Sequence, residues 1–413
     1  MKSQGFLGSN INQVKAHNVK MLLLSLLFSQ KLSRVQLAER TGLSNTTITN
    51  LVAELFDQGL ITESNCLDDE APETRPVGRP RTAICLLPDA KYVLGIHIGV
   101  GTYTVAVTNL NNKILASQRT TFNITDPPEQ VMNAMACTIT TLIAENHIKN
   151  KKIMGLGIGA SGLVNVSTGV NVLAPNLNWQ NVPIKDYFEE ALGFKVLVDN
   201  NVRAMALAEA YFGAARNVES MIFVYGRIGV GAGFIYKGRV FRGSAMGAGE
   251  IGHITMLPEG GEPCRCGRSG CLETLISEPA ILNQAAQIAK SQPDGLFSKL
   301  SSKSDNNDMM EKVFTAAREG DQAILEMLET RAYYLGCALV NVVNLINPEM
   351  ILLGGVYAQG QDLLLDPITK TVRENAFAGL GKQVRIQATS FGWKVGVLGA
   401  AALALTNFFY LPE

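Results

Sequence analysis

The chain has 413 residues, 47% of them hydrophobic and 17% charged, and its formal net charge at pH 7 is zero. This length favours two or three domains, and this apolar content allows a large buried core. A zero net charge argues against a protein that coats nucleic acid through a generally basic surface, but it allows one local DNA-reading surface.

No segment is predicted to enter a membrane. The apolar run at residues 21–28 is too short to cross a bilayer, and no small-residue cleavage site follows it. Asn341 and Asn344 interrupt the later apolar run at residues 333–346. Both runs predict buried amphipathic helices, so we expect a cytoplasmic protein without membrane association.

Residues 33–60 predict two helices joined by a short turn. Ser33 and Gln36 form a capping box at the start of the first helix, Gly42 ends it, and Ser44 caps the second helix. The pattern is typical of a helix-turn-helix, although an ordinary helical hairpin with a polar face shows it as well. The apolar residues of both helices fall on one stripe and can pack across the turn; they are Leu37, Ala38, Leu43, Ile48, Leu51, Val52 and Leu55.

The second helix presents short amide and hydroxyl side chains near its N-terminus, where free backbone N–H groups can approach a phosphate and side chains can reach base edges. Residues 60–62 and 83–86 are expected to pair as strands around the loop 66–82, which makes a wing. The loop carries an Arg-Pro-Arg segment thin enough for a narrow minor groove; its alternative interpretation is a polar interdomain linker. The predicted DNA-binding residues are Ser44, Asn45, Thr46, Thr47, Thr49, Asn50, Arg79 and Arg81.

A DNA-binding domain of this size, here called the head, normally binds DNA as a pair of copies on a site with two-fold symmetry. We therefore expect operator DNA as a partner and a homo-oligomer, either a dimer or a tetramer.

From about residue 92 onward, strands, glycine turns and helices alternate, which indicates an α/β body. The segments 92–110 (YVLGIHIGVGTYTVAVTNL) and 221–240 (MIFVYGRIGVGAGFIYKGRV) both follow the order strand, glycine turn, strand. Such a duplication is expected when two similar lobes close over a cleft. We expect a DNA-binding domain at 1–87, a first lobe at 88–210, and a second lobe at 211–413 whose C-terminal helix packs back on the first.

Three of the seven cysteines fall within eight residues, which indicates metal chemistry rather than a disulfide framework. His253, Cys264, Cys266 and Cys271 can complete a tetrahedral Cys₃His site, and a fully ligated site predicts structural Zn²⁺. The alternative is a loop with three free thiols. If one imidazole nitrogen of His253 binds zinc, the other is held in place to donate to a ligand hydroxyl.

The motif Glu250-Ile-Gly-His253, followed by Cys264-x-Cys266-Gly-x-x-Gly-Cys271-Leu-Glu273, resembles the ROK family (repressors, open reading frames and kinases) and specifically its repressor branch, with xylose-, glucose- and N-acetylglucosamine-responsive members. The resemblance covers nearly the whole chain. It implies an α/β fold in which an N-terminal winged helix-turn-helix joins a two-lobed, actin-like (ribonuclease H-like) ATPase-type sugar kinase fold, with zinc beside the sugar. Matching the family's sugar-holding residues are Gly162, Asn176, Asn200, Asn201, Glu250, His253 and Glu273. Trp179 is interpreted either as an apolar wall of the sugar site or as core.

Two departures from the family's kinases predict that phosphotransfer is lost. Kinases carry Asp-x-Gly-Gly-Thr in the first phosphate loop, where this chain has His97 and a branched Val100. The general-base aspartate of kinases is Asn201 here, and an amide has no useful basicity near neutral pH. In the second loop Arg227 replaces a small residue, a change that by itself leaves phosphate binding open.

We therefore predict a repressor, not an enzyme, that binds an unphosphorylated monosaccharide in a kinase-like cleft. Sugar binding would close the lobes and change the placement of two heads on DNA. Whether the sugar releases or promotes DNA binding stays open. The alternatives are a bifunctional ATP-dependent sugar kinase and a regulator controlled by a protein partner.

Overall fold

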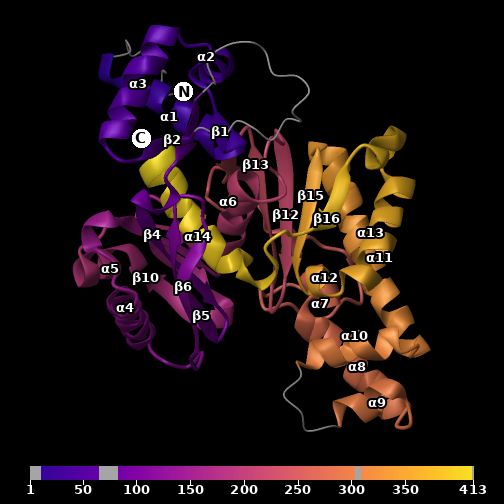
Figure 1. The fold of residues 1–413 in the computed structure, drawn as a ribbon. Helices are drawn as coiled ribbons and strands as arrows, with labels where there is room; N and C mark the ends of the chain where they lie inside the picture. Colours follow the sequence, from indigo (N-terminus) through magenta and orange to yellow (C-terminus); the bar gives the residue numbers. More distant parts are fainter. Residues whose placement is uncertain (1–10, 65–81, 303–307, 412–413) are drawn as a thin grey trace.

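The structure, a computed structural model, describes residues 11–64, 82–302 and 308–411, which form a small head above a body of two lobes (Figure 1). The head consists of three helices and a three-stranded antiparallel sheet in the order β1-β3-β2. Its elements are α1 (Ile11–Ser29), β1 (Lys31–Leu32), α2 (Arg34–Thr41), α3 (Asn45–Asp57), β2 (Ile61–Ser64) and β3 (Ala83–Leu86).

Local capping sets the bounds of the head helices as predicted. The Ser33 hydroxyl accepts from the Gln36 N–H at 3.3 Å, and the Gln36 side chain accepts from the Ser33 N–H at 2.8 Å. Gly42 ends α2 with φ of 69°, a left-handed conformation that glycine adopts without strain. The Ser44 hydroxyl accepts from the Thr47 N–H at 3.1 Å and starts α3. The capping box, the turn and the paired strands β2 and β3 are therefore confirmed.

Each lobe is built on a five-stranded sheet, and the two sheets have the same order of strands. Read from the antiparallel end, the first sheet runs β6-β5-β4-β7-β11 and the second runs β14-β13-β12-β15-β16. In each, an antiparallel meander continues into two parallel strands. This repetition confirms the two-lobed, actin-like α/β fold. The strands are β4 (Tyr92–Gly99), β5 (Thr102–Asn109), β6 (Ile114–Thr121), β7 (Ile153–Ala160), β11 (Val196–Asn200), β12 (Ser220–Gly226), β13 (Val230–Tyr236), β14 (Arg239–Phe241), β15 (Met350–Gly355) and β16 (Arg385–Ala388).

Two buried helices lie between the sheets. Helix α6 (Asn201–Phe212) packs on β12 and β13, α14 (Val395–Leu405) packs on β4 and β7, and the two helices pack on each other (Figure 1). Gly95 of β4 and Gly399 of α14 permit this close packing, because a Cβ at either would lie within 2.8 Å of neighbouring backbone. Helix α6 crosses the boundary expected after residue 210, since the helix and its burial continue to Phe212.

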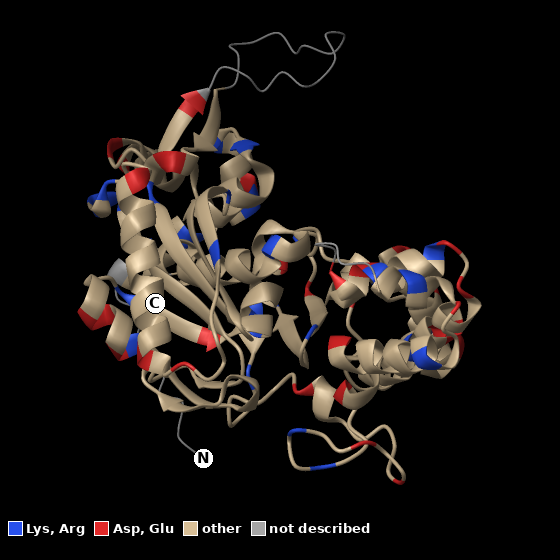
Figure 2. Cartoon of the chain, turned by 90° about the horizontal axis from the view of Figure 1, so that it is seen from below, with Lys and Arg blue, Asp and Glu red and all other residues tan. Residues whose placement is uncertain are grey.

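The remaining helices pack on the sheets or, in part of the second lobe, on one another. Lys and Arg are interspersed with Asp and Glu on the helices of the second lobe (Figure 2). Among the described residues, one segment, Gly392–Tyr410, is long and apolar enough to span a membrane, but it contains the core helix α14 and most of it is buried. The helices are α4 (Pro128–Glu145) and α5 (Ile184–Leu192) on the first lobe, and α7 (Glu273–Ile276), α8 (Glu278–Ser291), α9 (Leu296–Ser301), α10 (Met309–Arg318), α11 (Gln322–Ile346), α12 (Val356–Gln359) and α13 (Gln361–Asn375) on the second.

The head shares its hydrophobic core with the body. Leu22, Leu26 and other buried residues of the head belong to one cluster with residues of α6 and α14. At the junction the rings of Phe28 in α1 and Tyr211 in α6 are stacked, with centroids 6.2 Å apart. The head is thus packed directly on the helix pair that separates the two lobes.

Candidate ligand cleft and metal centre

A cavity of about 570 Å³, the ligand cleft, lies between the lobes. The loop after β4 and the start of α6 line it from the first lobe, and the segment between β14 and Glu273 lines it from the second. The structure brings together all seven residues predicted to bind sugar, since the lining includes Gly162, Asn176, Asn200, Asn201, Glu250, His253 and Glu273.

The first-lobe wall is organised by the capped start of α6. The Asn200 side chain accepts from the N–H groups of Val202 and Arg203 and donates to the Gly162 carbonyl at 3.0 Å. Gly162 has φ of 96°, and a Cβ there would lie 2.5 Å from a backbone oxygen, so this close approach requires glycine. The Asn201 side chain donates to the Ser161 hydroxyl at 3.2 Å. Both amides are therefore fixed in place at the cleft.

The second-lobe wall supplies two carboxylates. Glu273 accepts from the N–H of Val230 at 2.8 Å, which holds it against the glycine turn between β12 and β13. Burial raises the pKa of Glu250, although the neighbouring His253 and Arg203 side chains oppose this effect. Two carboxylates, of which Glu273 is held by a backbone N–H, thus line the cleft opposite the amides of the first lobe.

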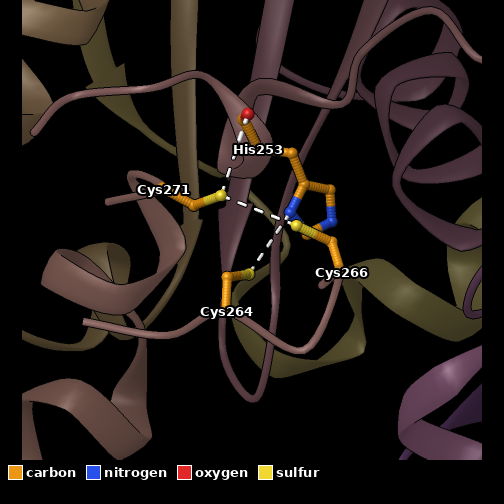
Figure 3. A group of neighbouring side chains, drawn as sticks. All are labelled: His253, Cys264, Cys266 and Cys271. Carbon is orange, nitrogen blue, oxygen red and sulfur yellow. Dashed lines mark hydrogen bonds between the residues drawn. The ribbon is translucent and has the colours of Figure 1, made fainter. Parts of the chain in front are cut away.

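Next to this wall, four potential ligand atoms of His253, Cys264, Cys266 and Cys271 lie within 4.8 Å of one another (Figure 3). The Cys266 and Cys271 sulfurs are 3.6 Å apart, and the Cys264 sulfur lies 3.7 Å from Nδ1 of His253. Zn–S bonds of about 2.3 Å in a tetrahedron place the sulfurs roughly 3.8 Å apart. The donors therefore fit a Cys₃His zinc site in number, chemistry and spacing.

Arg265 is a charged residue of the cleft that was not predicted from the sequence. It lies between two of the cysteines, lines the cleft, and donates from Nη1 to the side-chain oxygen of Asn176 at 2.6 Å. Asn176 belongs to the first lobe, so this bond crosses the cleft. The position of an arginine between two closely spaced cysteines is the only signal in the sequence, and it does not reveal the partner.

The half of the cleft that would hold phosphate in a kinase has unusual side chains here. Nε2 of His97 is buried without a hydrogen-bond partner among the described residues. Burial lowers the pKa of His97 to about 4, helped by the charges of Arg227 and Arg119, so the imidazole is neutral at pH 7. The Arg227 guanidinium lies over the ring of Trp393, and its Nε is 3.7 Å from a carboxylate oxygen of Glu278.

Of the two interpretations of Trp179, the core one is correct. Its side chain is 2% exposed and belongs to the core of the first lobe rather than to the lining of the cleft.

The predicted DNA-binding side chains of the head form an exposed polar surface on α3, with Thr47 half-buried and the others exposed. The Ser44 and Thr47 hydroxyls bond each other at 2.9 Å, and the Thr49 hydroxyl donates to the Asn45 carbonyl. Asn45, Thr46 and Asn50 are left to face outward. Arg79 and Arg81 lie outside the described residues.

Comparison with known proteins places this geometry in a family. The ROK family profile matches residues 93–407. The xylose repressor of Caldicellulosiruptor bescii is 28% identical over 98% of this chain and 99% of its own. A crystal structure of a ROK family transcriptional regulator, a homolog of the E. coli MLC protein, is 27% identical with a TM-score of 0.79, covering 96% of this chain and 98% of the other. The ROK family glucokinase of Streptomyces griseus, solved with glucose and AMPPNP, is 28% identical with a TM-score of 0.67 and covers 76% of this chain and 98% of its own.

Proposed function

Because this chain belongs to the ROK family, we propose that it is a cytoplasmic, DNA-binding transcriptional repressor that responds to an unphosphorylated monosaccharide. One observation carries the proposal. Amides and carboxylates of both lobes meet in one cavity at the start of a helix whose other end contacts the head. The repressor and the regulator compared above align with nearly the whole chain, whereas the glucokinase aligns with 76% of it.

The cleft suits a sugar because hydroxyl groups need donors and acceptors at fixed positions. Glu250 and Glu273 accept hydrogen bonds, and the amides of Asn200 and Asn201 donate and accept. With Nδ1 of His253 directed at the cysteines, Nε2 of the same ring is available to donate to a sugar hydroxyl. Because these groups come from both lobes, a bound sugar favours the closed cleft.

We propose that the protein does not transfer phosphate to the sugar. Asn201 stands where the kinases have their general base, and an amide does not take up a proton near neutral pH. Neutral His97 cannot replace the loop carboxylate, and Val100 adds a branched side chain where phosphate approaches backbone. The similarity to a glucokinase favours a bifunctional sugar kinase as the second candidate.

A zinc ion held by His253, Cys264, Cys266 and Cys271 would be structural, because four protein ligands leave no position for water. Its contribution would be to fold the loop 264–271 and to hold the His253 ring beside the cleft. Metal binding and sugar binding would therefore share one side chain.

Helix α3 would read operator DNA through Asn45, Thr46 and Asn50, with a second copy of the chain on the other half-site. We propose that α6 carries the signal. Its first turn holds the cleft amides, its buried Glu209 accepts from the N–H and hydroxyl of Ser390 at 2.9 Å between β16 and α14, and Tyr211 contacts the head. Closure of the lobes would shift the two heads out of the half-site spacing and release the DNA.

A melting-temperature screen of the purified protein with monosaccharides and their phosphates tests the sugar site. We expect an unphosphorylated sugar to raise the melting temperature, with a size set by its concentration relative to its Kd. Response to none of them would refute the proposal and favour control by a protein partner. A coupled ADP-release assay with ATP and hexoses tests the kinase, and brisk turnover would establish it instead.

A further inference from the structure

Asp199 is a buried carboxylate that accepts hydrogen bonds from two arginines and one backbone N–H. It lies at the end of β11, directly before the two cleft asparagines, and its side chain is 1% exposed. Its Oδ1 accepts from Nε of Arg203 and from the N–H of Asn200, both at 2.7 Å. Its Oδ2 accepts from Nε and Nη2 of Arg242 at 3.0 and 2.7 Å. Asp199 thus orients the start of α6 with one oxygen and holds a distant segment with the other.

That distant segment, residues 242–249, is the cover segment. It connects β14 to the short 3-10 helix Ile251–His253 and contains no helix or strand of its own. Ala245, Gly247, Ala248 and Gly249 line the cleft, and Glu250 follows directly. The N–H of Ala232 in β13 donates to the Gly249 carbonyl at 2.7 Å and fixes the end of the segment, whereas side-chain contacts fix its start and its middle.

Arg203 makes a second connection to the cover segment. It is 2% exposed, and its Nη1 donates to the carbonyl of Met246 at 2.6 Å, near the middle of the segment. The same guanidinium, with Nη2 buried and unbonded among the described residues, opposes the rise in the pKa of Glu250. Asp199 and Arg203 therefore fix the cover segment at two points, one from the end of β11 and one from the first turn of α6, on either side of Asn200 and Asn201.

The energetics favour a role in geometry over a role in stability. Removing charged groups from water costs several kcal/mol for each ion, so a buried ion pair often stabilises a fold no better than apolar residues would. Two N–H groups of one guanidinium on one carboxylate oxygen, as Arg242 places them on Oδ2 of Asp199, instead define distance and orientation. Of the two arginines that bond Asp199, Arg242 belongs to the cover segment itself, and its side chain is 30% exposed.

We propose that Asp199 is a positioning residue of the sugar site, which clamps the cover segment, through Arg242 and Arg203, over the amides at the start of α6. This inference rests on the proposed sugar-binding function. It implies that the two walls of the cleft are aligned before the sugar arrives, so that loosening the clamp weakens sugar binding without affecting the DNA-reading head.

Arg242→Gln tests the clamp, because it frees the cover segment and leaves the buried Asp199–Arg203 pair intact. The matched control is Arg318→Gln, which removes another arginine that donates through Nε and Nη2 to one carboxylate, that of Asp362 at 2.8 and 2.9 Å, on the outer helices of the second lobe. Each variant is compared with the wild type as the full-length protein. The readouts are amide hydrogen exchange in residues 243–249, the Kd of the monosaccharide that gives the largest melting shift, and sugar-free DNA affinity.

For Arg242→Gln we expect faster exchange in the cover segment, about tenfold weaker sugar binding, and unchanged sugar-free DNA affinity. Arg242→Lys keeps the charge but loses the paired Nε and Nη2 donors, so its sugar affinity should lie between those of Arg242→Gln and wild type. Arg318→Gln should match wild type in all three readouts.

Wild-type sugar affinity in Arg242→Gln would overturn the inference and leave the proposed function intact. So would a parallel loss of sugar-free DNA binding, because that result indicates a general structural role. If the wild type itself binds no monosaccharide, the proposed function fails and the inference fails with it; unchanged exchange in Arg242→Gln would disprove the clamp by itself.

Discussion

The ring of Tyr211, in the last turn of α6, stacks on the ring of Phe28 in α1 with an interplanar angle of 21°. Asn201 is the first residue of the same helix and faces the cleft. A helix of these 12 residues is about 18 Å long. One rigid element therefore touches both the ligand cleft and the head, which gives the proposed signal a direct path within each copy of the chain.

Phe28→Ala should uncouple the head from the cleft. Loss of this half-buried ring removes roughly 1–2 kcal/mol of apolar contact at the junction. We expect sugar affinity within twofold of wild type but a reduced effect of sugar on DNA affinity, measured by fluorescence anisotropy. Phe56→Ala removes an exposed phenylalanine from the same head and serves as the control. Full sugar-dependent release in Phe28→Ala would argue against signalling through this contact.

Metal analysis of the purified protein should find one zinc per chain. Cys266→Ser, at the exposed cysteine of the cluster, should lose the metal, lower the melting temperature and weaken sugar binding, because His253 loses its support. Cys137→Ser, which changes an exposed cysteine outside the cluster, should retain all three properties. A zinc-free wild type with intact sugar binding would contradict the structural role of the metal.

Asn201→Asp should not restore phosphotransfer. A general base contributes about 10²–10⁴-fold to such a rate, but His97 and Val100 still alter the phosphate loop. We expect ADP release to stay at the sugar-free background in both the wild type and the variant. Hexose-dependent turnover in Asn201→Asp would mean that the lost base alone separates this chain from the kinases.

The pH dependence of stability should reveal the neutral imidazole of His97. Its pKa is about 4 in the folded protein, below the ordinary histidine pKa of 6.5, so the unfolded state takes up a proton first as pH falls. This lowers the free energy of unfolding between pH 6.5 and 4, by at most about 3 kcal/mol. In denaturant titrations His97→Gln should lack this component. An identical loss in both proteins would place the acid sensitivity elsewhere.

Local signals account for what could be predicted in the head. The capping box at Ser33, the cap at Ser44 and the glycine at 42 act over three or four residues, so the sequence displays them directly. The two-residue strand β1 was not predicted, because its conformation comes from pairing with Cys85 and Ile84 of β3.

In the body, motif spacing revealed the cysteine cluster, and the family resemblance supplied the cleft residues. The bonds from Arg265 to Asn176 and from Arg242 to Asp199 could not be predicted, since each joins residues brought together only by the packing of the lobes. The stacking of Phe28 on Tyr211 escaped prediction for the same reason. A helix pattern shows which face is apolar, but not which other element will cover it.

The central claim is that the cleft binds sugar and thereby controls the head. Its most direct test is the affinity of the full-length protein for a DNA fragment selected by that protein, measured by anisotropy with and without the monosaccharide that gives the largest melting shift. The account predicts that saturating sugar weakens DNA binding at least tenfold and that the phosphorylated form of the sugar does so less. DNA affinity that is the same with and without every sugar that binds would contradict it.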